Sequence, residues 1–448
     1  MNTSQVLCEN VHASRWENIP ESVRHEARRS LLNYFAVGFA GAHDPTIEKL
    51  VSTYTAFSAN HAASIIGRDE RTDMLNAAAL NAMSANVFDY DDTHLQTVIH
   101  PTAPVAAALL AFSEVNRVSG RDFIQALILG MEVECRIGNS ISPYHYGRGW
   151  HITSTCGVMG AAIAVGWLLR LSPKQLNWAL GGAANQACGI VETLGTMAKS
   201  LSVGNAARNG MLSALLAAQD FDGPIAPLDG VRGFLNVTGQ QPDLAGINAQ
   251  FGEHWEMALN TYKPYPCGIV LNPVIEACLM LSARQDVERN IEKGLQSVEV
   301  TGQQLLRDRT DRPGVKTGRE SQVSAQHAVP VALLRGRAGL AEFSDEAVSD
   351  PKIRALGEKL RFTVDNTMSI DAARVTLHYV GAPSVTMFVE QARGSTGRPL
   401  TDQDLEEKFK VLSAQAHSGF DGDQLIRSVW EIESIDDVGA LMALARRS

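Results

Sequence analysis

The sequence feature that most limits the fold is a change of hydrophobic pattern that occurs twice along the chain. From about Ile19 to about Phe251, apolar residues recur at helical spacing in stretches rich in alanine and glycine. From Lys263 to about Ser395 the chain carries short, β-branched, alternating stretches, which predict strands. The remaining C-terminal residues return to the helical pattern. This order predicts a mainly α fold with a smaller α+β domain inserted into a helical one.

Four stretches define the expected strands of the inserted domain. They are SVEVTG (residues 297–302), RFTVD (361–365), ARVTLHYV (373–380) and SVTMFVEQ (384–391), and the last two predict a hairpin around a glycine-containing loop. With 448 residues the chain is long enough for two domains. We therefore expect a large all-helical domain built from both chain ends, residues 1–262 and 396–448, and an α+β lid domain over residues 263–395.

Charge and cysteine usage argue against several classes of partner. The net charge of −10 and the sequence pI near 5.7 disfavour a nucleic-acid surface and a polybasic membrane patch. The 6 cysteines are scattered without a C-x-x-C pair, as reduced cytosolic thiols usually are. The start of the chain lacks a secretory pattern, and the most apolar segment, residues 153–169, contains three glycines, which favours a buried helix over a membrane span. These features predict a cytoplasmic protein.

The stretch FDYDDTHLQTVIHP, residues 88–101, concentrates three carboxylates, two threonines and two histidines. Asp89, Asp91, Asp92, His94 and His100 could ligate a metal, but their spacing matches no EF-hand and the chain has no H-E-x-x-H motif. They could equally form an acidic turn after a helix. The third alternative is a proton-transfer pocket in which aspartate and histidine tune each other's pKa. These residues alone leave the three alternatives open.

Three further stretches carry candidate residues in apolar surroundings. GRGWHITSTCG places Arg148 and His151 just before an apolar helix, where free N–H groups can bind an anion. TMAKSLSVGNAARNG holds Lys199 in a mostly uncharged run, as either a surface lysine or a desolvated functional amine. NTYKPYPCGIVLNP places Lys263 and Cys267 around a rigid Pro-Tyr-Pro at the domain junction, where pockets often form. A pyridoxal-phosphate lysine is disfavoured at both positions, because the chain lacks the pattern of an α/β cofactor domain.

In their order and spacing, these stretches resemble the MmgE/PrpD family, which includes 2-methylcitrate dehydratases, cis-aconitate decarboxylases and iminodisuccinate epimerases. The resemblance covers nearly the whole chain, from IPESVRHEARRSLLNYFAVGFAG through the four stretches above to GRPLTDQDLEEKF. It implies the two-domain architecture already predicted and assembly as a homodimer. It also implies that the protein needs no metal, iron–sulfur cluster or organic cofactor.

The resemblance further implies which residues form the active site, because each lies on a matching motif. The matched residues are Asp89, Thr93, His100, His151, Lys199 and Lys263, and of these Thr93 is expected to contact substrate while the other five are catalytic. Arg148, Cys267 and His327 are additional candidates for substrate binding. His327, in SAQHAVPVALL, stands where the decarboxylase branch has a tyrosine, which disfavours a mechanism that needs a phenol. Asn33 stands where many relatives have aspartate, and we expect a structural role for it.

The implied chemistry is the movement of a proton at the carbon next to a carboxylate of a small di- or tricarboxylate. Such a carbon is a weak acid, so the enzyme must surround the neighbouring carboxylate with cations and place a base near the proton. The two lysines and Arg148 could supply the cations. The two histidines, tuned by Asp89, could act as base and acid.

Epimerisation, dehydration and decarboxylation all fit such a pocket. The stretch DYDDTHLQTVIHPTAPVAAAL and the presence of His327 favour an isomerase similar to iminodisuccinate epimerase. The alternatives are a hydro-lyase similar to 2-methylcitrate dehydratase and then a decarboxylase similar to cis-aconitate decarboxylase. A helical binding or scaffold module without enzymatic activity is a further alternative, in which the polar clusters are structural. We expect a small anionic carboxylate as substrate and no nucleic-acid or membrane partner.

Overall fold

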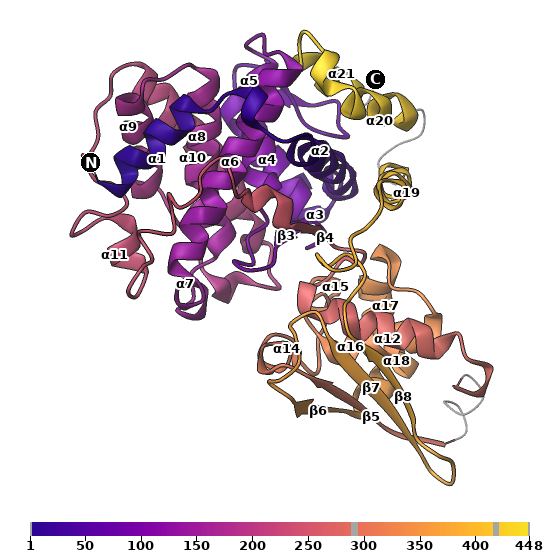
Figure 1. Cartoon of the computed structure of the whole chain (residues 1–448). Coiled ribbons are helices and arrows are strands. Elements are labelled where there is room, and N and C mark those ends of the chain that lie inside the picture. The colour runs from indigo at the N-terminus through magenta and orange to yellow at the C-terminus, as the bar shows by residue number, and fades with distance from the viewer. Residues whose placement is uncertain (1, 288–293, 415–420, 447–448) are drawn as a thin grey trace.

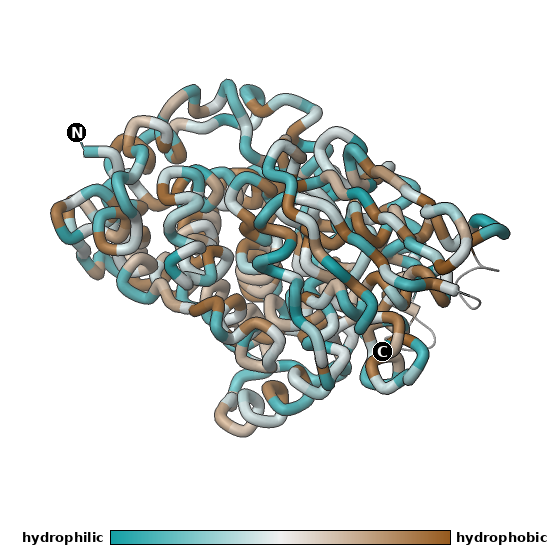
Figure 2. Tube along the Cα trace, turned by 90° about the horizontal axis from the view of Figure 1, so that it is seen from below, coloured by the Kyte–Doolittle hydropathy of each residue, from teal (hydrophilic) through white to brown (hydrophobic). Residues whose placement is uncertain are grey.

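The fold is mainly helical (Figure 1), which confirms the predicted class. The computed structural model describes residues 2–287, 294–414 and 421–446. These residues include no helix with the length and apolar character of a membrane span. In the view of Figure 2, apolar and polar residues alternate along the outer segments.

The larger part of the molecule is a helical body whose elements come from both ends of the chain. Its helices are α1 (Thr3–Ala13), α2 (Glu21–Gly41), α3 (Pro45–Thr55), α4 (Met74–Asn86), α5 (Thr102–Ser113), α6 (Gly120–Ile141), α7 (Tyr144–Gly147), α8 (Ile152–Leu168), α9 (Pro173–Asn185), α10 (Ala198–Ala218), α11 (Phe234–Thr238), α19 (Asp402–Ser413), α20 (Gly422–Trp430) and α21 (Gly439–Leu444). Side chains cap several of them: Asp73 accepts the N–H of Asn76 at the start of α4, and Ser119 caps α6 in the same way.

Helix α8 lies at the centre of this body and is buried from Ile152 to Trp167. It approaches its neighbours closely because glycines line the contacts. A Cβ atom added to Gly160 would lie 2.8 Å from the carbonyl oxygen of Gly130 on α6, and one added to Gly210 on α10 would lie 2.5 Å from that of Val158. The buried helix predicted over residues 153–169 is therefore confirmed, and small residues hold α6, α8 and α10 together.

Two large hydrophobic clusters organise the molecule. The first joins buried residues from positions 7–262 with residues from positions 400–445, and the second lies within positions 265–389. Both chain ends thus contribute to one core, while the segment between them builds its own. The domain boundaries at residues 263 and 395 stay a prediction.

The second cluster lies between a mixed sheet and short helices. The strands are β5 (Leu295–Gly302), β6 (Leu360–Val364), β7 (Ala373–Tyr379) and β8 (Val385–Val389), and the helices are α12 (Asn272–Ser282), α14 (Gln304–Thr310), α15 (Gly318–Ser321), α16 (Ala325–Arg335), α17 (Asp345–Ser349) and α18 (Pro351–Gly357). The sheet order is β6-β5-β7-β8, with β5 and β6 parallel and the other pairs antiparallel. Helices α12 and α16 lie beside the sheet in Figure 1. All four predicted strands and the β7–β8 hairpin are confirmed.

A short ribbon at the junction of the two parts positions the candidate site. Strand β3 (Asp92–His94) pairs antiparallel with β4 (Asn260–Tyr262), so that Thr93 lies opposite Thr261. A second small ribbon, β1 (Ala63–Ser64) with β2 (Arg71–Thr72), lies elsewhere in the body. Because β3 follows residues 88–91 and β4 precedes Lys263, the β3–β4 pairing brings these distant segments together.

Candidate active site

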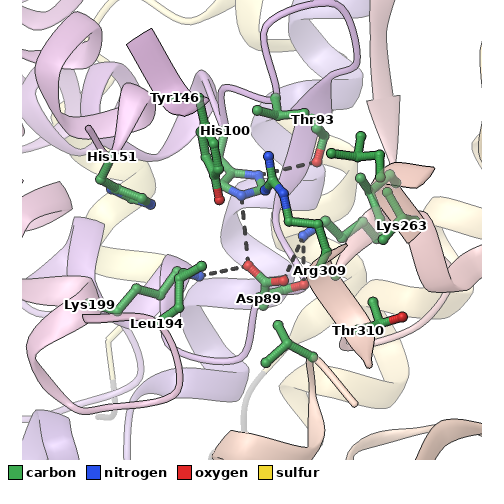
Figure 3. Close-up of a pocket in the computed structure, with 16 residues that line it drawn as sticks. Asp89, Thr93, His100, Tyr146, His151, Leu194, Lys199, Lys263, Arg309 and Thr310 are labelled. Atoms are coloured by element: carbon green, nitrogen blue, oxygen red, sulfur yellow. Dashed lines mark hydrogen bonds and ion pairs between the residues drawn. The ribbon is translucent and has the colours of Figure 1, made fainter. Parts of the chain in front are cut away.

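A pocket at the junction is lined by residues from both parts of the molecule (Figure 3). Its polar lining consists of Asp89, Thr93, His100, Tyr146, His151, Lys199, Lys263, Arg309 and Thr310. The apolar lining comes largely from segments that follow Lys263, including Ile269, Val270 and Leu305. All six residues matched to the family motifs therefore lie on one pocket.

Asp89 is at the centre of the polar lining. It follows α4 in a left-handed conformation, with φ of 52°, which aspartate tolerates better than most residues. Its Oδ1 lies 2.6 Å from Nζ of Lys199, and its Oδ2 lies 3.2 Å from Nζ of Lys263. Burial alone would raise the pKa of Asp89, but the ammonium groups of Lys199 and Lys263 hold it well below its usual value. Asp89 is therefore ionised and pairs with two cations.

Lys199 and Lys263 reach Asp89 from different elements. Lys199 lies in the first turn of α10, and Lys263 directly follows β4. Lys263 is only 1% exposed, and its Nζ also donates to the backbone carbonyl oxygen of Asp89 at 2.9 Å. Burial would lower the pKa of Lys199, but the carboxylate of Asp89 raises it above its usual value. Lys199 is therefore desolvated rather than a surface lysine, and its catalytic role stays a prediction.

His100 presents one ring nitrogen to the pocket as an acceptor. Its Nδ1 lies 2.7 Å from the carbonyl oxygen of Asp92, which can only accept, so Nδ1 carries the proton. Thr93 Oγ1 lies 3.2 Å from the same nitrogen. The unprotonated Nε2 faces Asp89, with 3.7 Å between it and Oδ1. Burial lowers the pKa of His100, with an opposing effect of the carboxylate of Asp91.

His151 is arranged in the same way on the other side of the pocket. Its Nδ1 lies 3.3 Å from Ser154 Oγ and 3.4 Å from Ser202 Oγ. Both hydroxyls donate to backbone carbonyl oxygens, those of His151 and Lys199, so they accept from Nδ1–H. Nε2 is therefore left unprotonated. Burial lowers the pKa of His151 to about 3, and the nearby Lys199 acts in the same direction.

The free energy of unfolding is expected to fall at acid pH in part because of His151. Between the ordinary pKa of 6.5 and the folded value of about 3, the unfolded chain binds a proton at this residue and the folded protein does not. Above pH 6.5 the imidazole is neutral in both states and the free energy of unfolding does not depend on its titration; from pH 6.5 down to about pH 3 it falls by about 1.4 kcal/mol per pH unit. Urea unfolding at a series of pH values measures this slope.

A pair of histidine variants isolates this contribution. In His151→Leu the free energy of unfolding should fall less steeply with acid, because one fewer proton is taken up on unfolding. The same change at His61, which is exposed, should leave the wild-type slope unchanged. A parental slope in His151→Leu would contradict an uncharged imidazole at this position.

The other two carboxylates of the 88–101 stretch, those of Asp91 and Asp92, do not line the pocket and instead hydrogen-bond to buried side chains that hold the loop in place. Asp91 Oδ2 accepts from Asn86 Nδ2 at 2.7 Å. Asp92 Oδ2 accepts from Thr102 Oγ1 at 2.5 Å and from Asn260 Nδ2 at 2.7 Å. Burial raises the pKa of Asp92 to about 6, although these hydrogen bonds oppose the shift. These contacts fix the carbonyl group of Asp92 that orients His100.

A metal ion was one alternative for this stretch. Potential ligand atoms of Asp89, Asp91 and His100 lie within 4.8 Å of one another. Both oxygens of Asp89, however, already pair with the ammonium groups of Lys199 and Lys263. The two ammonium groups beside Asp89 would repel a metal cation bound at the same carboxylate. The described contacts favour an anion in the pocket over a divalent cation.

Lys408 of α19 supports the site from the C-terminal segment. Its Nζ donates to Asn33 Oδ1, to the carbonyl oxygen of Tyr90 and to that of Lys263, each at 2.9 Å. It thereby ties α2, the Asp89 loop and the end of β4 together. Asn33 is buried and accepts this bond, which agrees with the structural role expected for it.

Three candidates lie outside the pocket lining. Arg148 is exposed at the end of α7. Cys267 is fully buried, and its Sγ lies 3.8 Å from Asn272 Oδ1. His327 donates from Nε2 to the carbonyl oxygen of Glu342 at 2.7 Å and lines a different cavity, among residues of α16 and α18. Because His327 lies away from this pocket, its identity does not favour an epimerase here. Substrate contacts by these three residues stay a prediction.

Two pocket residues were not identified from the sequence. Tyr146 of α7 lies on the pocket, and its hydroxyl points toward the middle of the labelled side chains in Figure 3. Arg309 of α14 stacks on it, with the guanidinium carbon 3.8 Å from the ring centroid. Tyr146 directly precedes the stretch GRGWHITSTCG, so its place beside Arg148 and His151 in the sequence was a usable signal. Arg309 lies in the charged run LLRDRTDR, which resembles an ordinary solvated helix.

Comparison with known families covers almost the whole chain. Family models described as the MmgE/PrpD N-terminal domain and the MmgE/PrpD C-terminal domain match residues 5–246 and 265–432. Both parts of the molecule are therefore covered.

Individual relatives are similar over nearly their full lengths. A cis-aconitate decarboxylase of Aspergillus terreus is 28% identical over 461 residues, which cover 96% of this chain and 92% of the relative. The cis-aconitate decarboxylase-like protein oryM of Aspergillus oryzae is 28% identical, with 99% and 97% covered. The cis-aconitate decarboxylase of Mus musculus is 25% identical, with 97% and 92% covered. The chain therefore belongs to the MmgE/PrpD family and is an enzyme of that type.

Proposed function

We propose that the protein is a lyase that removes carbon dioxide from a small unsaturated tricarboxylate, with cis-aconitate as the first candidate. The observation that carries this proposal is the charge balance of the pocket. Lys199 and Lys263 share the single carboxylate of Asp89, beside two imidazoles whose pKa values are lowered. The pocket therefore has an excess of positive charge where a substrate carboxylate would bind. The names of the relatives favour this lyase over the epimerase expected from the sequence.

The reaction needs stabilisation of negative charge. Loss of carbon dioxide from the saturated carbon of cis-aconitate breaks a carbon–carbon bond and leaves the electron pair on the substrate. The pair moves across the double bond toward a second carboxylate, and a proton added next to that carboxylate gives an unsaturated dicarboxylate. Ammonium groups beside the second carboxylate lower the barrier, because its negative charge grows in the transition state. Lys199 and Lys263 take this role.

Tyr146 is the proton donor in this scheme. Its hydroxyl points into the pocket, and burial raises the pKa of Tyr146, so the phenol holds its proton until the electron pair develops. The phenol missing at position 327 is thus supplied by another residue. After the transfer, the phenolate regains a proton from water.

Epimerisation is the second candidate, favoured by the presence of two imidazoles on one pocket. An epimerase removes a proton from one face of a carbon and returns one to the other face, so it needs two acid–base groups. His100 and His151 each hold Nδ1–H on a fixed acceptor and present Nε2 to the pocket. Either could start such a reaction as a base.

Proton NMR in deuterium oxide separates these reactions. The substrates are cis-aconitate, citrate, 2-methylcitrate and iminodisuccinate. We expect the signals of cis-aconitate to be replaced by those of an unsaturated dicarboxylate carrying deuterium. A new alkene from citrate or 2-methylcitrate would make the protein a hydro-lyase, and exchange at the α-carbon of iminodisuccinate without an alkene would make it an epimerase. No reaction of any of the four would contradict both candidates.

A further inference from the structure

Arg309 enters the pocket from the α+β part, on the wall that faces the helical body. It lies near the end of α14, and its guanidinium group stacks on the ring of Tyr146, which belongs to α7. In Figure 3 the Arg309 side chain extends across the pocket toward His100 and Tyr146. A stacked guanidinium is restricted in orientation but keeps its N–H donors free at the edge.

The donors of Arg309 have no carboxylate partner in the described part of the chain. Arg307, two residues earlier on the same helix, pairs with Asp311 at 3.6 Å. Arg309 has no such pair, although it is partly buried on the pocket wall. Its neighbours on that wall include the apolar residues Leu305, Ile269 and Val270. A partly buried guanidinium in apolar surroundings is stabilised when an anionic ligand binds to it, because the charge-assisted hydrogen bonds replace those lost to water.

We propose that Arg309 is a specificity-determining residue that binds a second carboxylate of the substrate. One carboxylate pairs with Lys199 and Lys263 on the helical body, and another accepts a bidentate pair of hydrogen bonds from Arg309 on the α+β part. A polycarboxylate thereby bridges the two parts of the molecule, whereas a monocarboxylate occupies only the lysine side. This inference rests on the proposed function, because it assumes a small carboxylate as the ligand.

Calorimetric titration with an unreactive ligand tests the inference without relying on turnover. Propane-1,2,3-tricarboxylate carries three carboxylates and no double bond, and butyrate carries one carboxylate on a similar chain. R309M should weaken binding of the tricarboxylate by about 10- to 100-fold, the loss typical of a charge-assisted pair. R309K should recover part of the affinity, since it restores the charge without the planar fork.

Two controls make the result specific. R307M removes an exposed arginine from the same helix and should leave the affinity for the tricarboxylate unchanged. Butyrate, measured by competition, should bind wild type and R309M equally. Equal loss for butyrate and the tricarboxylate would mean that Arg309 only holds Tyr146 in place, and it would overturn the proposal.

The remaining outcomes separate this inference from the proposed function. Tight binding of the tricarboxylate to wild type, with no loss in R309M, would overturn the role of Arg309 and leave the proposed function standing. Absence of binding by either carboxylate to wild type would overturn both. In each variant, an unchanged melting temperature shows that the fold is intact.

Discussion

Replacing Lys199 with methionine is expected to lower kcat for decarboxylation of cis-aconitate by about 10²- to 10³-fold, the usual cost of removing one donor that stabilises transition-state charge. Lys199 is buried, and its Nζ lies 2.6 Å from Asp89 Oδ1. Methionine keeps the length and the apolar stem but removes the cation. Asp89 would then keep Lys263 as its remaining ammonium partner, so the excess positive charge beside Asp89 would be lost.

The matched control is Lys49→Met, which removes an exposed lysine from α3. It should leave kcat unchanged, since its charge is screened by solvent. The measurement is a steady-state rate assay that separates kcat from KM. Retention of full kcat in K199M would contradict a role for this ammonium in the chemical step.

The second large effect concerns the packing that holds the catalytic helices together. Gly210→Ala is expected to lower the free energy of unfolding by about 2–3 kcal/mol, near the upper range for overpacking, even though alanine is the better helix former. A Cβ at this position would lie 2.5 Å from the carbonyl oxygen of Val158 and 2.6 Å from Cβ of Ala161. These are atoms of the adjacent helix rather than the end of a flexible side chain, so α10 and α8 must move apart.

That separation should also lower activity, because α10 carries Lys199 and α8 begins directly after His151. The control is Gly147→Ala, where a Cβ would meet no atom within 4 Å. Urea unfolding of the two variants compares them directly. Equal stability of the two proteins would contradict the close approach of α8 and α10.

Local sequence patterns predicted most of the secondary structure but not the contacts that build the site. The β7–β8 hairpin is confirmed because alternation and a glycine-containing loop are both local signals. The parallel pairing of β5 with β6 depends on strands about sixty residues apart, and no local pattern specifies such pairing. The same holds for β3 and β4, whose register brings Lys263 to Asp89.

The pocket residues divide in the same way. Asp89, Thr93 and His100 are neighbours in the sequence, and a single stretch placed them together. Arg309 lies on the pocket because the chain folds so that its guanidinium contacts the ring of Tyr146, a distant residue, which the charged neighbours of Arg309 in the sequence do not indicate. His327 came from a motif comparison, and its position in another cavity follows from the packing of α16 and α18, which is a tertiary property.

Release of carbon dioxide from cis-aconitate, measured for the purified wild-type protein and for K199M, tests most directly whether the protein is a decarboxylase that uses Lys199. We expect one equivalent of carbon dioxide for each cis-aconitate consumed by wild type, and a rate for K199M lower by about 10²-fold or more. Consumption of cis-aconitate without carbon dioxide, or equal rates for the two proteins, would contradict this expectation.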